Sequence, residues 1–203
     1  RQKESVAVDL VATLASLLTR NGNRVGAMLY DNRIELTIPP RGGRIQVLRL
    51  IDEMLSRRPS PGRSMTDLTP LLESAINTIR RRSVVVLVSD FICAPGWGGP
   101  MSVLGRRHDL LPVRIWDRRE SELPDVGVVV VEDAETGEQL DADTHDKKLR
   151  ERFAEAAMRR EEGLKQTFRR VGVDELSMST EEDIVSAILR FVALRRRARR
   201  RQR

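Results

Sequence analysis

The sequence predicts an α/β fold built on a mostly parallel sheet with helices on both faces. We expect this sheet to contain the strands near residues 25–30, 84–90 and 110–116. Between residues 3 and 116, segments with helical spacing of apolar residues alternate with strand-like segments, as in parallel sheets with crossover helices. Residues 83–90, S-V-V-V-L-V-S-D, form a continuous and mostly β-branched apolar run. Such a run is typical of a strand covered on both faces. The length of 203 residues suits one such domain better than two.

The first elements are a helix and a hairpin. Residues 3–20 place apolar side chains at helical spacing, and Asn21-Gly22 provides the left-handed stop that ends many helices. Residues 24–30 form a short apolar run that indicates a buried strand, and residues 33–38 alternate as a half-buried strand that pairs back on it. We expect Pro39-Pro40 to end this hairpin.

Two helices then lead to the buried strand. Residues 43–57 are amphipathic, and residues 59–64, P-S-P-G-R-S, indicate a loop. Thr66 or Asp67 caps the next helix, which carries apolar residues between 68 and 79 on one face. The buried strand follows directly on this helix.

A further helix and strand follow the buried strand. Residues 101–107 predict a short helix after a loop at 94–100, and residues 109–116, D-L-L-P-V-R-I-W, predict a strand. Because proline cannot donate a ladder hydrogen bond, Pro112 suggests that this strand lies nearer an edge of the sheet.

Beyond residue 117 the pattern changes. Residues 126–143 indicate a hairpin around A-E-T-G, and residues 146–170 predict a long, highly charged helix. A short strand is expected at 173–178. Residues 179–183, S-T-E-E-D, then cap a terminal helix whose apolar residues lie between 184 and 194.

The positive charge is concentrated at one end of the sequence. The chain has 36 Lys and Arg against 30 Asp and Glu, but residues 195–203 alone hold seven arginines and no acid. The rest of the chain holds 29 basic and 30 acidic residues, which argues against a nucleic-acid-binding body. We therefore predict a domain at 1–194 and an arginine-rich tail at 195–203.

Composition also bears on the compartment. No apolar run approaches the roughly 18 to 20 residues needed to cross a bilayer. Cys93 is the only cysteine, which excludes an internal disulfide and a multi-cysteine metal site. A reducing, cytoplasmic compartment fits best. The sequence opens with Arg1 and not with Met, so we expect a piece upstream to be missing.

Two polar segments lie where a parallel sheet is expected to bind ligands. The buried strand delivers Asp90 to the carboxyl edge of the sheet, where ligands gather in open α/β folds. Thr66 lies in a loop that enters a helix. A hydroxyl and a carboxylate suit Mg²⁺, but two side chains are too few for a cation that takes about six oxygen ligands. Asp90 is equally consistent with a plain cap of the turn that follows it. Thr66 or Asp67 is expected to cap the next helix whether or not a metal binds.

Other motifs that carry chemistry are absent from the sequence. It contains neither G-x-x-x-x-G-K-[ST] nor G-x-G-x-x-G, so a glycine loop around phosphate is unsupported. His108 and His145 lack a second histidine at metal-ligand spacing, and His108 is expected to mark a helix end. Residues 141–146 depart from a calcium-binding loop at its sixth position, Asp146. Cys93 has no histidine placed to activate it.

A set of seven segments occurs along the chain in a characteristic order. They are R-N-G-N-R-V-G-A-M-L-Y (20–30), I-P-P-R-G-G-R (38–44), M-T-D-L (65–68), V-S-D-F (88–91), R-R-H-D (106–109), E-L-P-D-V-G (122–127) and S-T-E-E-D…L-R-F (179–191). Together they resemble the bacterial domain-of-unknown-function family 58, which is similar to von Willebrand factor A domains. The resemblance covers nearly the whole chain.

The resemblance implies a von Willebrand factor A-like (Rossmann-like) fold with a metal-ion-dependent adhesion site. In that family Mg²⁺ lies between a D-x-S-x-S segment after the first, central strand, a threonine matched by Thr66 and an aspartate matched by Asp90. This chain contains no D-x-S-x-S, so we expect its first strand to be missing and its Mg²⁺ binding to be weak. Asn23 stands where an aspartate is common, and Ser64-Met65 where the threonine loop usually carries glycine.

The same resemblance implies a function. Members of the family resemble partners of MoxR-type AAA+ ATPases that act together in maturing or remodelling other proteins. The chain is then a non-catalytic protein-interaction module rather than an enzyme.

Two other functions remain open at the level of sequence. The arginine tail can bind an anionic surface or nucleic acid, at roughly 1 kcal/mol per arginine at most, or it can simply solubilise the terminal helix. The chain is only 3% aromatic, so a base-stacking surface is not indicated. A metal-dependent hydrolase that uses Asp90 lacks an identifiable second carboxylate or histidine beside it.

Overall fold

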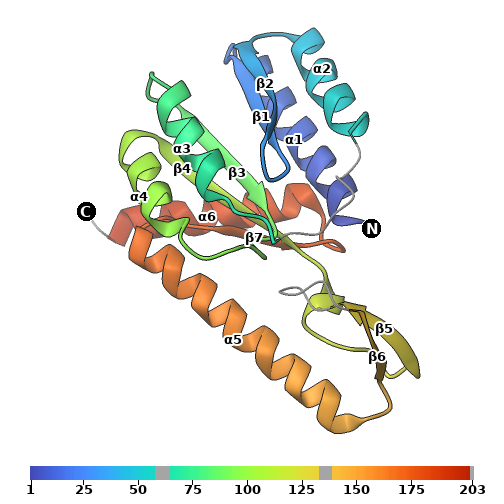
Figure 1. The fold of residues 1–203 in the computed structure, drawn as a ribbon. Helices are drawn as coiled ribbons and strands as arrows, with labels where there is room; N and C mark the ends of the chain where they lie inside the picture. Colours follow the sequence, from blue (N-terminus) through green and yellow to red (C-terminus); the bar gives the residue numbers. More distant parts are fainter. Residues whose placement is uncertain (58–64, 133–138, 202–203) are drawn as a thin grey trace.

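The centre of the molecule is a three-stranded parallel sheet (Figure 1). The computed structural model describes residues 1–57, 65–132 and 139–201, without the side chains of 129, 131–132, 139–142 and 194–201. Strands β3 (Val84–Ser89), β4 (Asp109–Trp116) and β7 (Leu176–Ser179) lie in the order β3-β4-β7. Both pairings are parallel, so the predicted α/β architecture with a parallel sheet is confirmed.

Helices cover both faces of this sheet, as its buried apolar run predicts. Helices α1 (Lys3–Arg20) and α6 (Ile184–Arg201) pack on one face. Helices α3 (Thr69–Thr78), α4 (Gly98–Arg107) and the end of α5 (Lys147–Val171) pack on the other. Along β3 the side chains alternate between the two cores, because successive residues of a strand point to opposite faces. Val85 and Leu87 join the α3–α4 core, and Val86 and Val88 join the α1–α6 core.

The hairpin forms a sheet of its own. Strands β1 (Val25–Tyr30) and β2 (Ile34–Arg41) pair antiparallel, and within the described residues β1 does not pair with β3. The expectation that the strand at 25–30 shares one sheet with the strands at 84–90 and 110–116 is therefore wrong. The hairpin packs instead on α1 and α2 (Arg44–Leu55) through a separate small core.

The two proline-based predictions are also wrong. Strand β2 continues through Pro39 and Pro40 to Arg41, which pairs with Val25. Among the described residues β2 pairs with β1 alone, so the other side of β2 needs no backbone donors and tolerates proline. Pro112 lies in β4, the central strand, but the pairing of β7 with β4 begins only at Val113. The proline thus precedes the doubly paired stretch.

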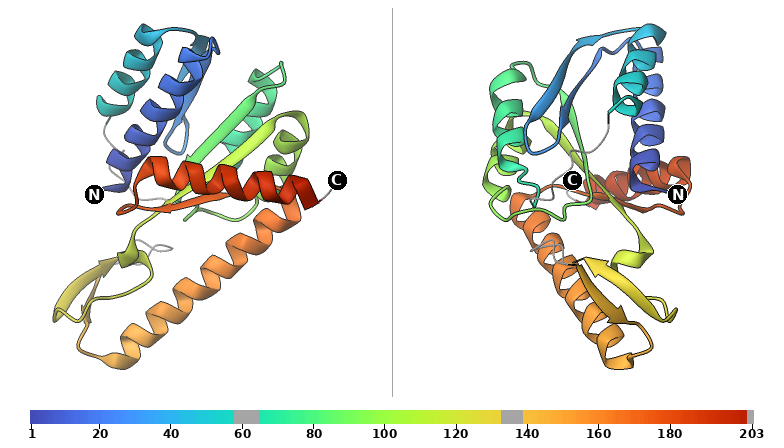
Figure 2. Two further views of the ribbon diagram at one scale, coloured as in Figure 1. Left: turned by 180° about the vertical axis from the view of Figure 1, so that it is seen from behind. Right: turned by 45° about the vertical axis from the view of Figure 1, so that its right-hand side comes forward.

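The region after β4 extends away from the sheet. The short helix η1 (Arg118–Glu120) leads to a hairpin of β5 (Val128–Glu132) and β6 (Gln139–Asp143), and the first half of α5 projects beside it (Figures 1 and 2). This hairpin and the long helix confirm the predicted elements. The predicted loop at 59–64 and the A-E-T-G turn lie outside the described residues.

The last helix is longer than the apolar pattern predicts. Asp183 accepts a hydrogen bond from the backbone N–H of Ser186 and so caps α6. The helical backbone then continues past Leu194 to Arg201, into the segment predicted as a tail. Among the described residues, no helix combines the length and the apolar character needed to cross a membrane.

Candidate site at the carboxyl edge of the parallel sheet

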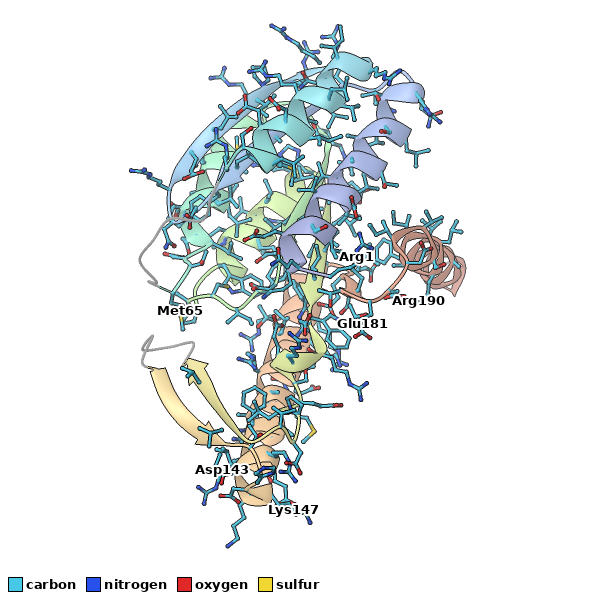
Figure 3. The ribbon with its side chains drawn as sticks, turned by 90° about the vertical axis from the view of Figure 1, so that its right-hand side faces the viewer. Arg1, Met65, Asp143, Lys147, Glu181 and Arg190 are labelled. Carbon is cyan, nitrogen blue, oxygen red and sulfur yellow. The ribbon has the colours of Figure 1, made fainter. Side chains whose placement is uncertain are left out.

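Two loops meet at the carboxyl end of β3. Asp90 directly follows the last residue of β3, and Thr66 lies in the segment that enters α3. Thr66 forms a parallel bridge with Cys93, and the backbone N–H of Ala94 donates to the carbonyl of Thr66 at 2.8 Å. Figure 3 shows Met65, the neighbour of Thr66, in the middle part of the molecule, where Arg1 also lies. The structure therefore brings the loops of Thr66 and Asp90 side by side.

The loop of Thr66 is held in place by the β1–β2 hairpin. The hydroxyl of Tyr30 donates to the carbonyl of Asp67 at 2.5 Å, and the side-chain oxygen of Asn32 accepts from the N–H of Asp67 at 3.4 Å. The carboxylate of Asp67 in turn accepts from the N–H of Thr69 at 2.8 Å. Asp67 thus satisfies the N–H of the first residue of α3. The N-cap position itself is Leu68, so neither Thr66 nor Asp67 occupies the capping position that the sequence predicted.

The loop of Asp90 is fixed by two side-chain turns and one unusual backbone angle. Ser89 Oγ accepts from the N–H of Phe91 at 3.0 Å, and Asp90 Oδ1 accepts from the N–H of Ile92 at 3.1 Å. Phe91 has a φ of 58°, in the left-handed region that a bulky residue rarely adopts. Its buried ring packs against Trp97 and Phe168, with centroids 5.6 and 5.1 Å away, and this packing holds the strained turn.

The second oxygen of Asp90 binds the first residue of α1. Lys3 Nζ lies 2.6 Å from Asp90 Oδ2 and 2.5 Å from Glu120 Oε1, so one ammonium bridges carboxylates that follow β3 and β4. The side chains of Lys3, Asp90 and Glu120 are 35%, 32% and 20% exposed. Burial lowers the pKa of Lys3, but the hydrogen bonds and charges of both carboxylates outweigh it and leave this pKa raised.

Cys93 lies in the same loop, and its thiol is unreactive at neutral pH. Burial, followed by the negative charges of Asp90 and Asp67, raises the pKa of its thiol to about 11. With this pKa the thiol of Cys93 is protonated at neutral pH. Because the thiolate is the nucleophile, the protonated thiol is unreactive.

The residues at this edge do not form a complete magnesium site. Mg²⁺ requires near-octahedral oxygen coordination, while one oxygen of Asp90 is bound to an ammonium and the other to a backbone N–H. In the part of the chain that the structure describes, no three His, Cys, Asp or Glu side chains are grouped to hold a metal. The arrangement instead carries two carboxylates against one ammonium.

Lys3 and Glu120 are the two members of this site that the sequence prediction missed. Glu120 follows the strand at 109–116 by four residues, so the rule that selected Asp90 would have selected it too. Lys3 carries a weaker signal: a cation at the first position of a helix opposes the helix dipole and therefore needs a partner elsewhere.

His108, His145 and Asp146, the other polar residues considered from the sequence, lie at helix ends or in turns. His108 ends α4, as predicted. His145 Nδ1 lies 2.6 Å from Asp125 Oδ1. The backbone N–H of His145 donates to the carboxylate of Asp143. Asp146 accepts from the N–H of Lys148 and so caps α5. Residues 143–146 are a helix-initiating turn.

Comparisons with known proteins agree on a family and a fold. The sequence profile of the family described as "Protein of unknown function DUF58" matches residues 1–163. Uncharacterized proteins of Mycobacterium tuberculosis and Mycobacterium bovis are each 33% identical over 196 residues, which is 97% of this chain and 62% of theirs. An uncharacterized protein of Mycobacterium avium is 34% identical over 160 residues, 79% of this chain and 94% of its own.

A solved structure shares the fold. The conserved hypothetical protein BatB from Bacteroides thetaiotaomicron superposes with a TM-score of 0.54 over 97% of this chain and 88% of BatB, at 10% sequence identity. At that identity the likeness concerns the fold alone. The chain spans 62% of the length of the M. tuberculosis and M. bovis relatives.

Proposed function

Because this chain belongs to the DUF58 family, whose function is unknown, we propose that it is a non-catalytic protein-interaction module of the von Willebrand factor A type. It presents the carboxyl edge of its parallel sheet to a protein partner. The observation that carries the proposal is the cluster of Lys3, Asp90 and Glu120, which lies at this edge and remains partly exposed.

The charge of the cluster supports a cationic ligand. Two carboxylates and one ammonium leave one negative charge in excess, and each group is about a fifth to a third exposed. A basic side chain of a partner can pair with the carboxylate oxygens from the solvent side. Mg²⁺ near Thr66 and Asp90 is the other candidate, and we propose that this chain alone binds it weakly, because too few oxygens are free.

An additional strand upstream of Arg1 is part of the proposal. In the described residues β1 and β3 belong to separate sheets, and neither pairs with the other. A strand between them would join the two sheets, and a D-x-S-x-S segment at its end would add the oxygen ligands that Thr66 and Asp90 lack.

The partner that we propose is a MoxR-type AAA+ ATPase, with a role in maturing or remodelling other proteins. This part rests on the resemblance to von Willebrand factor A-like partners of such ATPases. We place the complex in the cytoplasm, because Cys93 is free and the chain has no second cysteine to pair with it.

A pull-down with the MoxR-type ATPase of the same genome tests the proposal. We expect the chain to retain the ATPase and the Asp90→Ala and Glu120→Ala variants to lose it, with and without Mg²⁺ as separate arms. Glu155→Ala is the matched control, because Glu155 lies on the projecting part of α5 with its side chain 60% exposed. Equal retention by all variants would place the contact elsewhere on the molecule.

A further inference from the structure

Helix α6 exposes an apolar stripe on the side turned away from the sheet. Val185, Leu189 and Val192 are 53%, 64% and 37% exposed, although they follow one another at spacings of four and three residues. The opposite side of the same helix, including Ala187 and Phe191, is buried against the sheet and α1. The view from behind shows α6 lying across the outside of the molecule with no other described element over it (Figure 2).

The arginine run continues this stripe along the same helix. The helical backbone reaches Arg201, so six of the seven arginines at 195–203 lie on α6. Positions 196 and 199 follow Val192 by four and seven residues, which is the spacing of one helix face. From Ile184 to Arg201 the sequence contains no acidic residue. One face of one helix is therefore apolar in its first half and cationic in its second.

Glu182 and Asp183, which precede the first turn of this helix, are engaged in the fold. Glu182 is paired with Arg190, whose Nη2 lies 3.1 Å from Glu182 Oε2. Asp183 caps α6 through the N–H of Ser186. Figure 3, which looks along α6, shows Arg190 on the helix at the margin of the molecule. Both acids are therefore engaged before the arginine run begins.

We propose that α6 lies on an anionic lipid surface, with Val185, Leu189 and Val192 in the interfacial layer and the arginines on the lipid phosphates. An amphipathic helix with apolar residues beside a basic segment binds membranes through both buried apolar area and electrostatic attraction. Each arginine near an anionic leaflet contributes at most roughly 1 kcal/mol to the free energy of binding, and salt lowers this contribution. The apolar stripe adds a contribution to the binding free energy that salt does not screen. This inference is independent of the function proposed for the carboxyl edge.

The apolar stripe favours lipid over nucleic acid as the occupant. Nucleic-acid binding is dominated by phosphate contacts from basic side chains, and exposed aliphatic side chains add nothing to these contacts. The remainder of the chain holds 29 basic and 30 acidic residues, so its net charge does not favour a nucleic-acid footprint.

Vesicle flotation of the whole chain tests this proposal. We expect the protein to float with vesicles of equal parts phosphatidylcholine and phosphatidylglycerol and to remain below vesicles of phosphatidylcholine alone. Leu189→Gln should weaken binding to the anionic vesicles about tenfold at fixed salt, as expected for withdrawing one leucine side chain from an apolar layer. The matched control is Leu48→Gln on α2, since Leu48 is 53% exposed and far from α6 along the chain.

A second readout separates binding from folding defects. Leu189→Trp should show a blue-shifted emission on anionic vesicles and quenching by brominated lipids, while thermal melting of each variant is compared with that of the original chain. Wild-type affinity of Leu189→Gln would overturn the proposal, because arginines alone would then account for binding. Displacement of the vesicles by duplex DNA, with Leu189→Gln binding that DNA as tightly as the original chain, would make nucleic acid the occupant and would also overturn it.

Discussion

The ammonium nitrogen of Lys3 lies 2.6 Å from Asp90 Oδ2, which ties the first residue of α1 to the residue that follows β3. The same nitrogen reaches Glu120 at 2.5 Å. A cation supplied by the chain itself thus occupies one face of the aspartate that the sequence suggested as a metal ligand. This relationship leads directly to the first prediction.

Lys3→Met should raise the affinity of the chain for Mg²⁺. Removal of the ammonium frees one oxygen each of Asp90 and Glu120 and leaves two partly buried carboxylates without a counter-charge. We also expect a loss of about 1 kcal/mol in the free energy of unfolding at neutral pH, the upper range for ion pairs of this exposure. Isothermal titration calorimetry with MgCl₂ measures the first effect and urea denaturation the second.

The control for this prediction is Lys148→Met, because Lys148 is exposed at the start of α5. Alkaline pH gives a further check. Since folding raises the pKa of Lys3, its contribution to stability is fully present below 10.5 and is lost as the pH rises past that value. The stability difference between Lys3→Met and the original chain should therefore disappear in strong alkali. Unchanged Mg²⁺ affinity in Lys3→Met would contradict the account of the ammonium as a competing cation.

Cys93 should resist alkylation in the folded protein. With its pKa at about 11 instead of 9.0, the thiolate fraction at pH 8 falls about a hundredfold relative to the unfolded chain. Iodoacetamide labelling, followed by mass spectrometry with and without guanidinium, measures this ratio. Asp90→Asn should speed labelling of the folded protein, because the charge of Asp90 contributes to the raised pKa.

The same pKa shift predicts a pH dependence of stability. Below pH 9 both the folded and unfolded states keep the thiol proton, so the contribution of Cys93 is fully present. Between pH 9 and about 11 only the unfolded state loses it, so the free energy of unfolding falls through this window. Cys93→Ala should show a smaller fall in urea titrations across it, and an identical profile would refute the shift.

At position 91, glycine should be tolerated at least as well as alanine, the reverse of the usual order of stability. Phe91→Ala removes a buried ring from its contacts with Trp97 and Phe168 and should cost about 3 kcal/mol. Phe91→Gly removes slightly more but relieves the positive φ of 58°, which is worth about 1 kcal/mol in the left-handed region. We therefore expect the glycine variant to melt at or above the temperature of the alanine variant. A clearly lower melting temperature for glycine would show that the backbone angle is not strained.

Gly26 is required by the close approach of β2. A Cβ at position 26 would lie 2.6 Å from the carbonyl oxygen of Ile38 and 3.0 Å from the nitrogen of Pro40, both backbone atoms. Gly26→Ala should therefore destabilise the protein by about 2 kcal/mol. Gly42→Ala, whose Cβ would meet only the carbonyl oxygen of Asn23 at 3.7 Å, should change stability by less than about 0.5 kcal/mol.

The sequence predicted the parallel sheet well because its strands are covered on both faces. The apolar run at 84–88 and the strand at 109–116 were visible without tertiary information. Two of the errors came from proline. Pro39, Pro40 and Pro112 were read as local signals, but whether a strand tolerates proline depends on which neighbours pair with it, and pairing is a property of the whole fold.

Only the part of the site that follows the strands, and not the part that α1 contributes, was predictable from the sequence. Asp90 follows from the rule that ligands gather at the carboxyl ends of parallel strands, and Thr66 was selected as a hydroxyl in a loop that enters a helix. The role of Lys3 could not be derived, because the sequence does not state that α1 begins beside the end of β3. Its partners are 87 and 117 residues away along the chain, and only packing of α1 on the sheet brings them together.

Helix α1 divides its side chains between two cores, and this governs how the molecule opens. Val6 and Leu10 are buried with the sheet and α6, whereas Ala15 is buried with β2 and α2. Amide protons of β2 and of the second half of α1 should therefore exchange with solvent through an opening that leaves β4 intact. The first half of α1 should exchange only when β4 does, so a single helix would show two levels of protection along its length.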